Sequence, residues 1–218
     1  MDQEQEGEEV GLGAFLRLLR EAVGQIIYVQ HGEPFLSWMR VEAPRLFPEV
    51  FGALPEPVRR ALATELGWQL WNATPLPRND FRPRPLRRPR PADPCPCRSG
   101  REYGLCCAGA PEVPGLTPGF AWALLTAELP LDTAVALAEQ GAIPRPYVGI
   151  VARRLVESGR KESAASLFNA LFEDPELLDR SDMDSLDALA GAHEMLGRGE
   201  EVRLFIERFT EKFLRKDD

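Results

Sequence analysis

The four cysteines of this chain all lie within one short stretch, at positions 95, 97, 106 and 107. Disulfides usually join distant segments and cytosolic thiols are kept reduced, so this clustering indicates a metal site instead. A peptide this short cannot bury enough apolar surface to offset the conformational entropy that it loses on folding. We therefore expect a bound metal to order the segment.

Zinc is the metal that best fits four closely spaced thiols. It takes four sulfur or nitrogen ligands in a tetrahedron, and its binding supplies roughly 10–16 kcal/mol to fold such modules. Iron is the main alternative, because four-thiolate sites accept it. Four cysteine ligands leave no position for water or substrate. The sequence therefore predicts one structural Zn²⁺, with the ligands Cys95, Cys97, Cys106 and Cys107.

The residues between the cysteines favour a tight turn around the metal. Pro94 and Pro96 stiffen the approach to the first pair, and Ser99-Gly100 allows the chain to reverse towards the second pair. Four thiolates around a divalent ion carry about two negative charges. We therefore expect Arg98 and Arg101 to lie near the sulfur atoms.

This segment resembles the SEC-C motif, a zinc-binding tail found on the translocase motor SecA and on many smaller bacterial proteins. The resemblance covers residues 93–109 and rests on the run Asp-Pro-Cys-Pro-Cys, the following Ser-Gly, a tyrosine and the final Cys-Cys. SecA itself usually ends the motif in Cys-His. The motif also usually has glycine after its second cysteine and lysines beside its tyrosine, whereas this chain has Arg98, Glu102 and Gly104 there.

The resemblance implies zinc binding through the four cysteines. In the translocase the motif also implies an interaction with the export chaperone SecB and with ribosomes or acidic lipid. The chain has no Gly-rich phosphate loop ending in Gly-Lys-Ser/Thr, so nothing of the motor's ATPase accompanies the motif.

Hydrophobic periodicity on both sides of the cysteines predicts a mainly α-helical protein. Residues 1–9 carry five acids and are expected to form a disordered acidic tail. Residues 10–74 predict an N-terminal helical unit, because apolar residues recur at helical spacing. Pro34 and Pro57 are placed to open two further helices in it.

Residues 75–92 are rich in proline and arginine and predict an extended linker. Proline lacks an amide donor and restricts the residue before it, so neither helix nor sheet is expected there. This stretch is also strongly basic in an acidic chain. Two interpretations stay open: a solvated spacer, or a surface for an acidic partner. The candidate partner-binding residues, together with those of the motif, are Arg84, Arg87, Arg88, Arg90, Arg98 and Arg101.

Residues 117–218 predict stacked helix hairpins. An internal repeat at an offset of 38 residues aligns Ala164, Leu167, Phe168 and Leu171 with Val202, Phe205, Ile206 and Phe209. The pattern around Leu189, His193 and Leu196 resembles degenerate tetratricopeptide repeats. Other antiparallel helix pairs give similar patterns. Either arrangement predicts packing surfaces and grooves rather than an active site.

Charge and targeting signals limit where the protein acts. The net charge is −8 and the pI about 5.0, which argues against general attraction to nucleic acid or anionic membranes. The N-terminus has no basic region or apolar core of a secretory signal. No stretch reaches the roughly 20 mainly apolar residues of a transmembrane segment. We therefore expect a cytoplasmic protein.

No catalytic constellation accompanies these features, and we expect no enzyme activity. The only histidines are His31, at a helix end, and His193, on the apolar face of a helix. The main hypothesis is a non-catalytic zinc-binding adaptor of the bacterial cytosol that binds a protein partner. Two alternatives are RNA, ribosome or nucleic-acid association through the basic strip Arg82–Arg101, and an accessory subunit of an enzyme or defence system.

Overall fold

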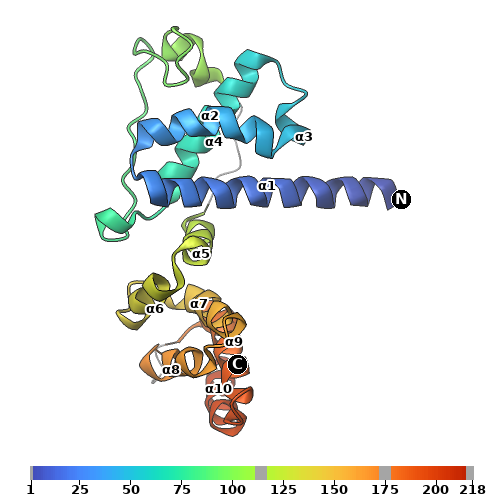
Figure 1. Ribbon diagram of the computed structural model, residues 1–218, viewed down its shortest axis with the longest axis vertical. Coiled ribbons are helices and arrows are strands. Elements are labelled where there is room, and N and C mark those ends of the chain that lie inside the picture. The colour runs from blue at the N-terminus through green and yellow to red at the C-terminus, as the bar shows by residue number, and fades with distance from the viewer. Residues whose placement is uncertain (1, 111–116, 172–177, 215–218) are drawn as a thin grey trace. The chain divides into compact units, whose positions relative to one another are not determined.

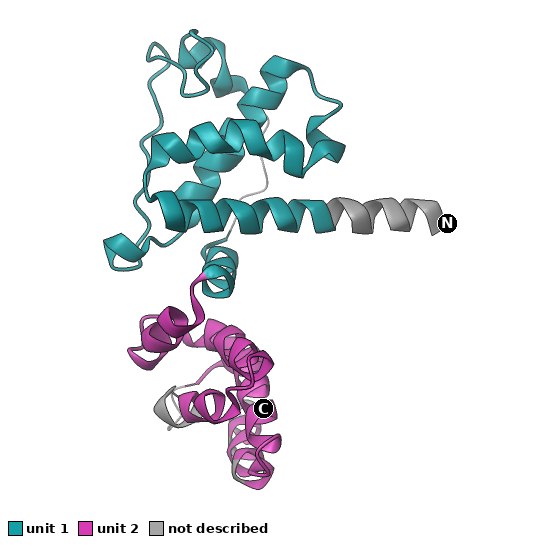
Figure 2. Ribbon diagram, viewed as in Figure 1, with its two compact units in different colours: residues 1–128 teal, residues 129–218 magenta. Residues whose placement is uncertain are grey.

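The structure is a computed structural model that describes residues 2–110, 117–171 and 178–214. Within these ranges the chain is mainly helical and contains no β-strand, as predicted (Figure 1). Two compact units divide it, Met1–Glu128 and Leu129–Asp218 (Figure 2). None of the described helices combines the length and apolar character that a membrane span requires.

Unit 1 is built from helices that pack around one apolar core. The helices are α1 (Asp2–Val29), α2 (Gly32–Leu46), α3 (Pro48–Phe51), α4 (Glu56–Ala73) and α5 (Pro118–Glu128). Proline occupies the first turn of α3 and of α4, where its missing N–H has no intrahelical partner to lose. The core contains fully buried side chains from four of the helices, among them Leu19, Ile26, Phe35, Leu70 and Leu125.

Helices α2 and α4 approach each other closely at Gly67. A Cβ atom at this position would lie 3.0 Å from Met39 Cγ and 3.1 Å from Leu36 Cδ2, closer than ordinary contacts allow. Next to it, the rings of Phe35 and Trp71 pack with their centroids 5.9 Å apart. This aromatic packing holds α2 on α4, the helix against which the segment with the cysteines also packs.

Two boundaries differ from those expected from the sequence. Helix α1 begins at Asp2 and so includes residues 2–9, for which we predict a disordered tail. Glutamate and glutamine are good helix formers, and acidic residues favour the positive end of the helix dipole. Helix α5, placed by the sequence in the C-terminal domain, belongs to unit 1 and packs on α1. Its apolar face, which includes Ala121 and Leu125, is buried.

The predicted linker does not run free, because residues 82–91, here called the strap, lie along α4. The indole Nε1 of Trp71 donates a hydrogen bond of 2.8 Å to the carbonyl of Arg84. That of Trp68 donates one of 3.0 Å to the carbonyl of Leu86. The backbone N–H of Leu86 donates one of 2.8 Å to Asn72 Oδ1. An extended proline-rich backbone makes no internal hydrogen bonds, so its carbonyls are available to these side chains.

Unit 2 contains helices α6 (Leu131–Glu139), α7 (Arg145–Glu157), α8 (Lys161–Leu171), α9 (Met183–Glu194) and α10 (Gly199–Leu214). Helix α7 packs on both α8 and α9, and α9 packs on α10. Of the repeated apolar positions, the buried side chains are those of Ala164, Leu167, Val202 and Phe209. The side chains of Phe168 and Leu171 lie outside the described residues. The helical prediction is confirmed, and membership of the tetratricopeptide family stays a prediction.

Candidate metal centre

The cysteines are held on two short turns that face each other. A bridge between Pro94 and Glu102 closes the first turn, where the backbone N–H of Cys95 donates a 2.9 Å hydrogen bond to the carbonyl of Arg101. The second pair stands at the junction of two 3₁₀ turns, η2 (Tyr103–Leu105) and η3 (Cys107–Gly109). Residues 93–109, here called the knuckle, therefore bring the two pairs of thiols together through backbone hydrogen bonds.

The four sulfur atoms are close enough to share one metal ion. The Sγ atoms of the four cysteines all lie within 4.8 Å of one another. Those of Cys97 and Cys106 are 3.4 Å apart. Four sulfurs at ~2.3 Å from a tetrahedral zinc lie about 3.8 Å from one another, a separation between the 3.4 Å and 4.8 Å found here, so small shifts of the side chains would complete the site. The donor set and its spacing both fit a single ion of the zinc type.

The backbone conformation of the first turn explains why the motif usually has glycine at the position that Arg98 occupies here. Arg98 has φ +57°, in the left-handed region that side chains other than glycine rarely adopt. Gly100, two residues later, has φ +77°. The departure from glycine at position 98 therefore leaves the turn intact but places a non-glycine residue in a strained conformation.

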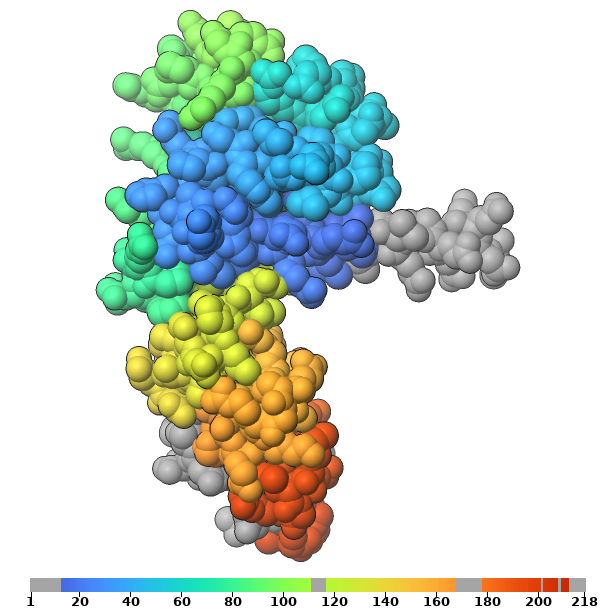
Figure 3. All heavy atoms as spheres, in the orientation of Figure 1, coloured from blue at the N-terminus to red at the C-terminus, as the bar shows by residue number. Residues whose placement is uncertain are grey.

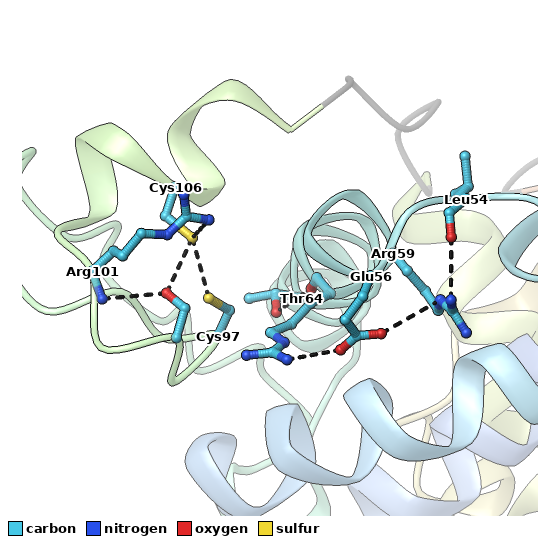
Figure 4. A network of polar contacts seen from close by, with 9 residues as sticks. Leu54, Glu56, Arg59, Thr64, Cys97, Arg101 and Cys106 are labelled. Carbon is cyan, nitrogen blue, oxygen red and sulfur yellow. Dashed lines mark hydrogen bonds and ion pairs between the residues drawn. The ribbon is translucent and has the colours of Figure 1, made fainter.

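Polar groups around Cys106 match the charge of a thiolate site. Arg101 Nη2 lies 3.3 Å from Cys106 Sγ, and Ser99 Oγ lies 3.2 Å from it (Figure 4). Cys106 is the half-buried member of the cluster, whereas the other three thiols are buried. The predicted position of Arg101 near a sulfur atom is therefore observed, and Arg98 lies exposed on the turn.

A small cavity opens beside Cys97 and Cys106, the two cysteines labelled in Figure 4. Its volume is about 230 Å³, and its lining includes Cys97, Cys106, Arg101 and the α4 residues Glu56 and Arg60. Glu56 accepts a 2.7 Å hydrogen bond from Arg60, so the wall on this side is an ion pair rather than a free cation.

The thiols titrate differently because their surroundings differ. Burial raises the pKa of Cys95 and, together with the neighbouring Cys95 and Cys97 groups, that of Cys107. Burial acts in the same direction on Cys97, but hydrogen bonds from Ser99, Cys95 and Cys106 outweigh it and lower the pKa of Cys97 to about 7. A divalent cation favours thiolates, so its binding would release the protons that burial retains.

The knuckle docks on the helical unit rather than hanging from it. Ala61 of α4 shares a buried apolar cluster with Tyr103 and three of the cysteines. Arg40 of α2 donates a 2.7 Å hydrogen bond to the carbonyl of Pro96, between the first two cysteines. The backbone N–H of Gly104 donates a 2.8 Å hydrogen bond to the carbonyl of Pro91 at the end of the strap. The metal site thus joins the strap and helices α2 and α4.

Arg88 completes this junction. Its Nη2 lies 2.5 Å from Glu65 Oε1 on α4, and its Nη1 lies 3.2 Å from the hydroxyl of Tyr103 in the knuckle. Glu65 is buried, with 7% of its surface exposed. Arg88, a predicted partner-binding residue, is therefore paired with two groups of unit 1, although its side chain is 58% exposed. Sequence reasoning missed Arg40 and Glu65, because no local pattern links them to the cysteines.

The other predicted residues do not gather at the metal centre. Arg84 and Arg87 are exposed on the strap, and Arg90 is exposed with its Nε 3.5 Å from Asp93. His31 is exposed at the start of α2. His193 is buried in unit 2, where its Nε2 lies 3.1 Å from the carbonyl oxygen of Ala165.

The geometry defines a knuckle with four thiols placed to bind one metal ion. Comparison with known families identifies the motif to which it belongs. The family model of the SEC-C motif matches residues 92–109, which include all four cysteines. The chain therefore carries a SEC-C motif. None of the curated proteins and none of the solved structures gives a match.

Proposed function

We propose that this protein is a non-catalytic zinc-binding adaptor of the cytoplasm, in which the metal orders a surface for a protein partner. The observation that carries the proposal is the convergence of four thiols within 4.8 Å in a segment docked on α4. The SEC-C match over the same residues supports zinc as the metal. Zinc held by Cys95, Cys97, Cys106 and Cys107 would supply the free energy that this short segment cannot obtain from burial alone.

The donor set supports a structural role over catalysis. Four thiolates fill a tetrahedral shell, and catalytic zinc sites keep one position for water or substrate. The nearest cationic group, Arg101, donates to Cys106 rather than facing an open coordination position. The chemistry that the metal would supply is therefore cross-linking of the two turns.

The knuckle also presents an apolar group to solvent. Leu105, one residue before Cys106, is 74% exposed, although an apolar side chain gains free energy from burial. Cys106 and Cys107 follow it directly, so metal binding would fix its position on η2. A protein partner that covers Leu105 is the occupant that the adaptor proposal requires.

Elemental analysis and affinity capture test the two parts of this proposal. Reduced, freshly prepared protein should contain one zinc per chain, and Cys97→Ser should lose it; absence of stoichiometric metal in the wild type would refute the zinc site. For the partner, Leu105→Glu changes the surface without touching a ligand. Arg17→Ser, on the exposed face of α1, serves as the control. Identical captured proteins for all three chains would remove the knuckle from partner binding.

A further inference from the structure

The first part of the strap, residues 82–86, is attached through backbone groups and not through arginine side chains. The carbonyl of Arg82 accepts hydrogen bonds from the backbone N–H of Leu76 and from Asn79 Nδ2. The carbonyls of Arg84 and Leu86 accept those of two tryptophan indoles. This part of the strap is therefore ordered by contacts that its arginine side chains do not make.

Three arginine side chains of the strap are left facing solvent. Arg82, Arg84 and Arg87 are all exposed, and within the described ranges none of their guanidinium groups is engaged by an acid. The strap runs along one edge of unit 1 and is coloured green in Figure 3. Arg88 and Arg90 differ, because they pair with Glu65 and Asp93. These three cations are carried by an extended backbone that is itself held in place.

A cavity opens directly beside Arg84. Its volume is about 550 Å³, and the strap contributes Arg84, Pro85 and Leu86 to its lining. The other walls come from Trp71 and from the corner between α1 and α2, with the polar residues Gln30, His31 and Glu33. Gln30 is held in place because its Oε1 accepts a 3.0 Å hydrogen bond from the backbone N–H of Arg78. The cavity thus offers amide, imidazole and carboxylate groups next to exposed cations.

We propose that the strap and this cavity bind single-stranded nucleic acid, with Arg82, Arg84 and Arg87 on successive phosphates and a base in the cavity. Guanidinium groups pair with phosphate through two parallel hydrogen bonds. An extended backbone rises about 3.1 Å per residue, so arginines two or three residues apart follow a stretched strand. Because the strap is already docked, binding loses little backbone entropy. This surface is separate from the knuckle surface of the proposed adaptor function.

The cavity favours single-stranded nucleic acid over a duplex, an acidic polypeptide or an anionic membrane. A base reaches a recessed pocket only when it is not paired and stacked, and single strands meet this condition at the lowest cost. The aspartate and glutamate side chains of an acidic polypeptide carry no ring that would occupy such a pocket as a base does, and a membrane surface cannot enter it. The net charge of −8 opposes long-range attraction, but charges farther than about 10 Å are screened at 0.1 M salt.

Fluorescence anisotropy with a labelled 12-nucleotide single strand, RNA or DNA, tests the proposal on the full chain. The variant R82S/R84S/R87S removes three free cations while leaving the backbone contacts of the strap. The control R17S/R153S/K161S removes the same charge from exposed positions elsewhere. The triple strap variant should bind at least about tenfold more weakly at low salt and lower the slope of log Kd against log salt by about 2, whereas the control should retain both.

A further variant distinguishes the contribution of the cavity to binding from that of the three arginines. His31 caps no helix N–H with its side chain, so His31→Ala leaves α2 intact. It should weaken binding of the single strand without changing the salt slope, because it removes a base contact. Unchanged affinity in His31→Ala, or tighter binding of a duplex or of polyglutamate than of the single strand, would overturn the proposal. So would no binding at 50 mM salt, or an equal loss in the control. Zinc content measured on each variant distinguishes these outcomes from failure of the metal site.

Discussion

The guanidinium of Arg40 donates a 2.7 Å hydrogen bond to the carbonyl oxygen of Pro96, so helix α2 directly contacts the turn between the first two cysteines. Its other Nη atom lies 2.9 Å from Ser37 Oγ, which orients the side chain. Desolvation by burial lowers the pKa of Arg40, and the nearby charge of Arg98 adds to this effect. Placing an arginine here at a cost in desolvation indicates that it positions the metal-binding turn.

Replacing Arg40 by alanine should therefore weaken zinc binding without removing a ligand. Outer contacts of metal sites typically contribute 10- to 100-fold in affinity, and we expect a loss of about tenfold or more. Competition with a chromophoric chelator measures it. The control is Arg45→Ala on the same helix, where the side chain is 73% exposed and pairs with Glu42. Equal affinities for the two variants would show that the Pro96 contact does not support the site.

Arg88 and Arg87 are neighbours with opposite surroundings, and they offer a matched pair of substitutions. Arg88→Ala would leave Glu65 as a buried carboxylate without its ion pair. The Arg88 side chain is 58% exposed, so we expect a loss of about 1–2 kcal/mol in the free energy of unfolding, below that of a fully buried pair. Arg87→Ala should change it by less than about 0.5 kcal/mol. Urea denaturation followed by tryptophan fluorescence compares them, and similar midpoints would argue against a structural role for Arg88.

The clustering of the four thiols and most helices could be predicted from the sequence because their signals are local. The cysteine spacing and Pro57 at the start of α4 each act within a few residues. The docking of the strap depends instead on Trp68 and Trp71, which meet carbonyls 13 to 18 residues away. Nothing in a proline-rich run specifies which donors its carbonyls will find.

Arg98→Gly should stabilise the knuckle. The residue has φ +57°, and the left-handed region costs a residue other than glycine roughly 1–2 kcal/mol. We expect the unfolding midpoint of the zinc-bound protein to rise by an amount equivalent to about 1 kcal/mol. Gly100→Ala, at φ +77° with open space around it, should act in the opposite direction and isolates the backbone effect from steric clashes. A destabilised Arg98→Gly would mean that the arginine side chain contributes more than its conformation costs.

Gly149→Ala should destabilise unit 2 through a close backbone approach. Ser185 Oγ accepts a 2.8 Å hydrogen bond from the N–H of Gly149 and donates one of 2.7 Å to the carbonyl of Arg145, so α9 inserts a hydroxyl into the first turn of α7. A Cβ at position 149 would lie 2.6 Å from Ser185 Cα. Overpacking of this kind costs about 1–3 kcal/mol. A Cβ at Gly191 in α9 would meet no atom within 4 Å, so Gly191→Ala should instead stabilise unit 2 by up to about 1 kcal/mol. Thermal unfolding of both variants decides the point.

Removal of the metal should loosen the strap while leaving the helices folded. The strap is fixed at one end by the hydrogen bond between Gly104 N–H and the Pro91 carbonyl, and Gly104 belongs to the segment that the metal orders. Without that attachment, the indoles of Trp68 and Trp71 lose ordered carbonyl partners and become more accessible to water. Chelation should therefore shift tryptophan emission to the red with little change in far-UV circular dichroism, and added zinc should reverse the shift. Trp68→Phe should show a smaller shift than the wild type, whereas unchanged emission on chelation in the wild type would mean that strap and metal centre are independent.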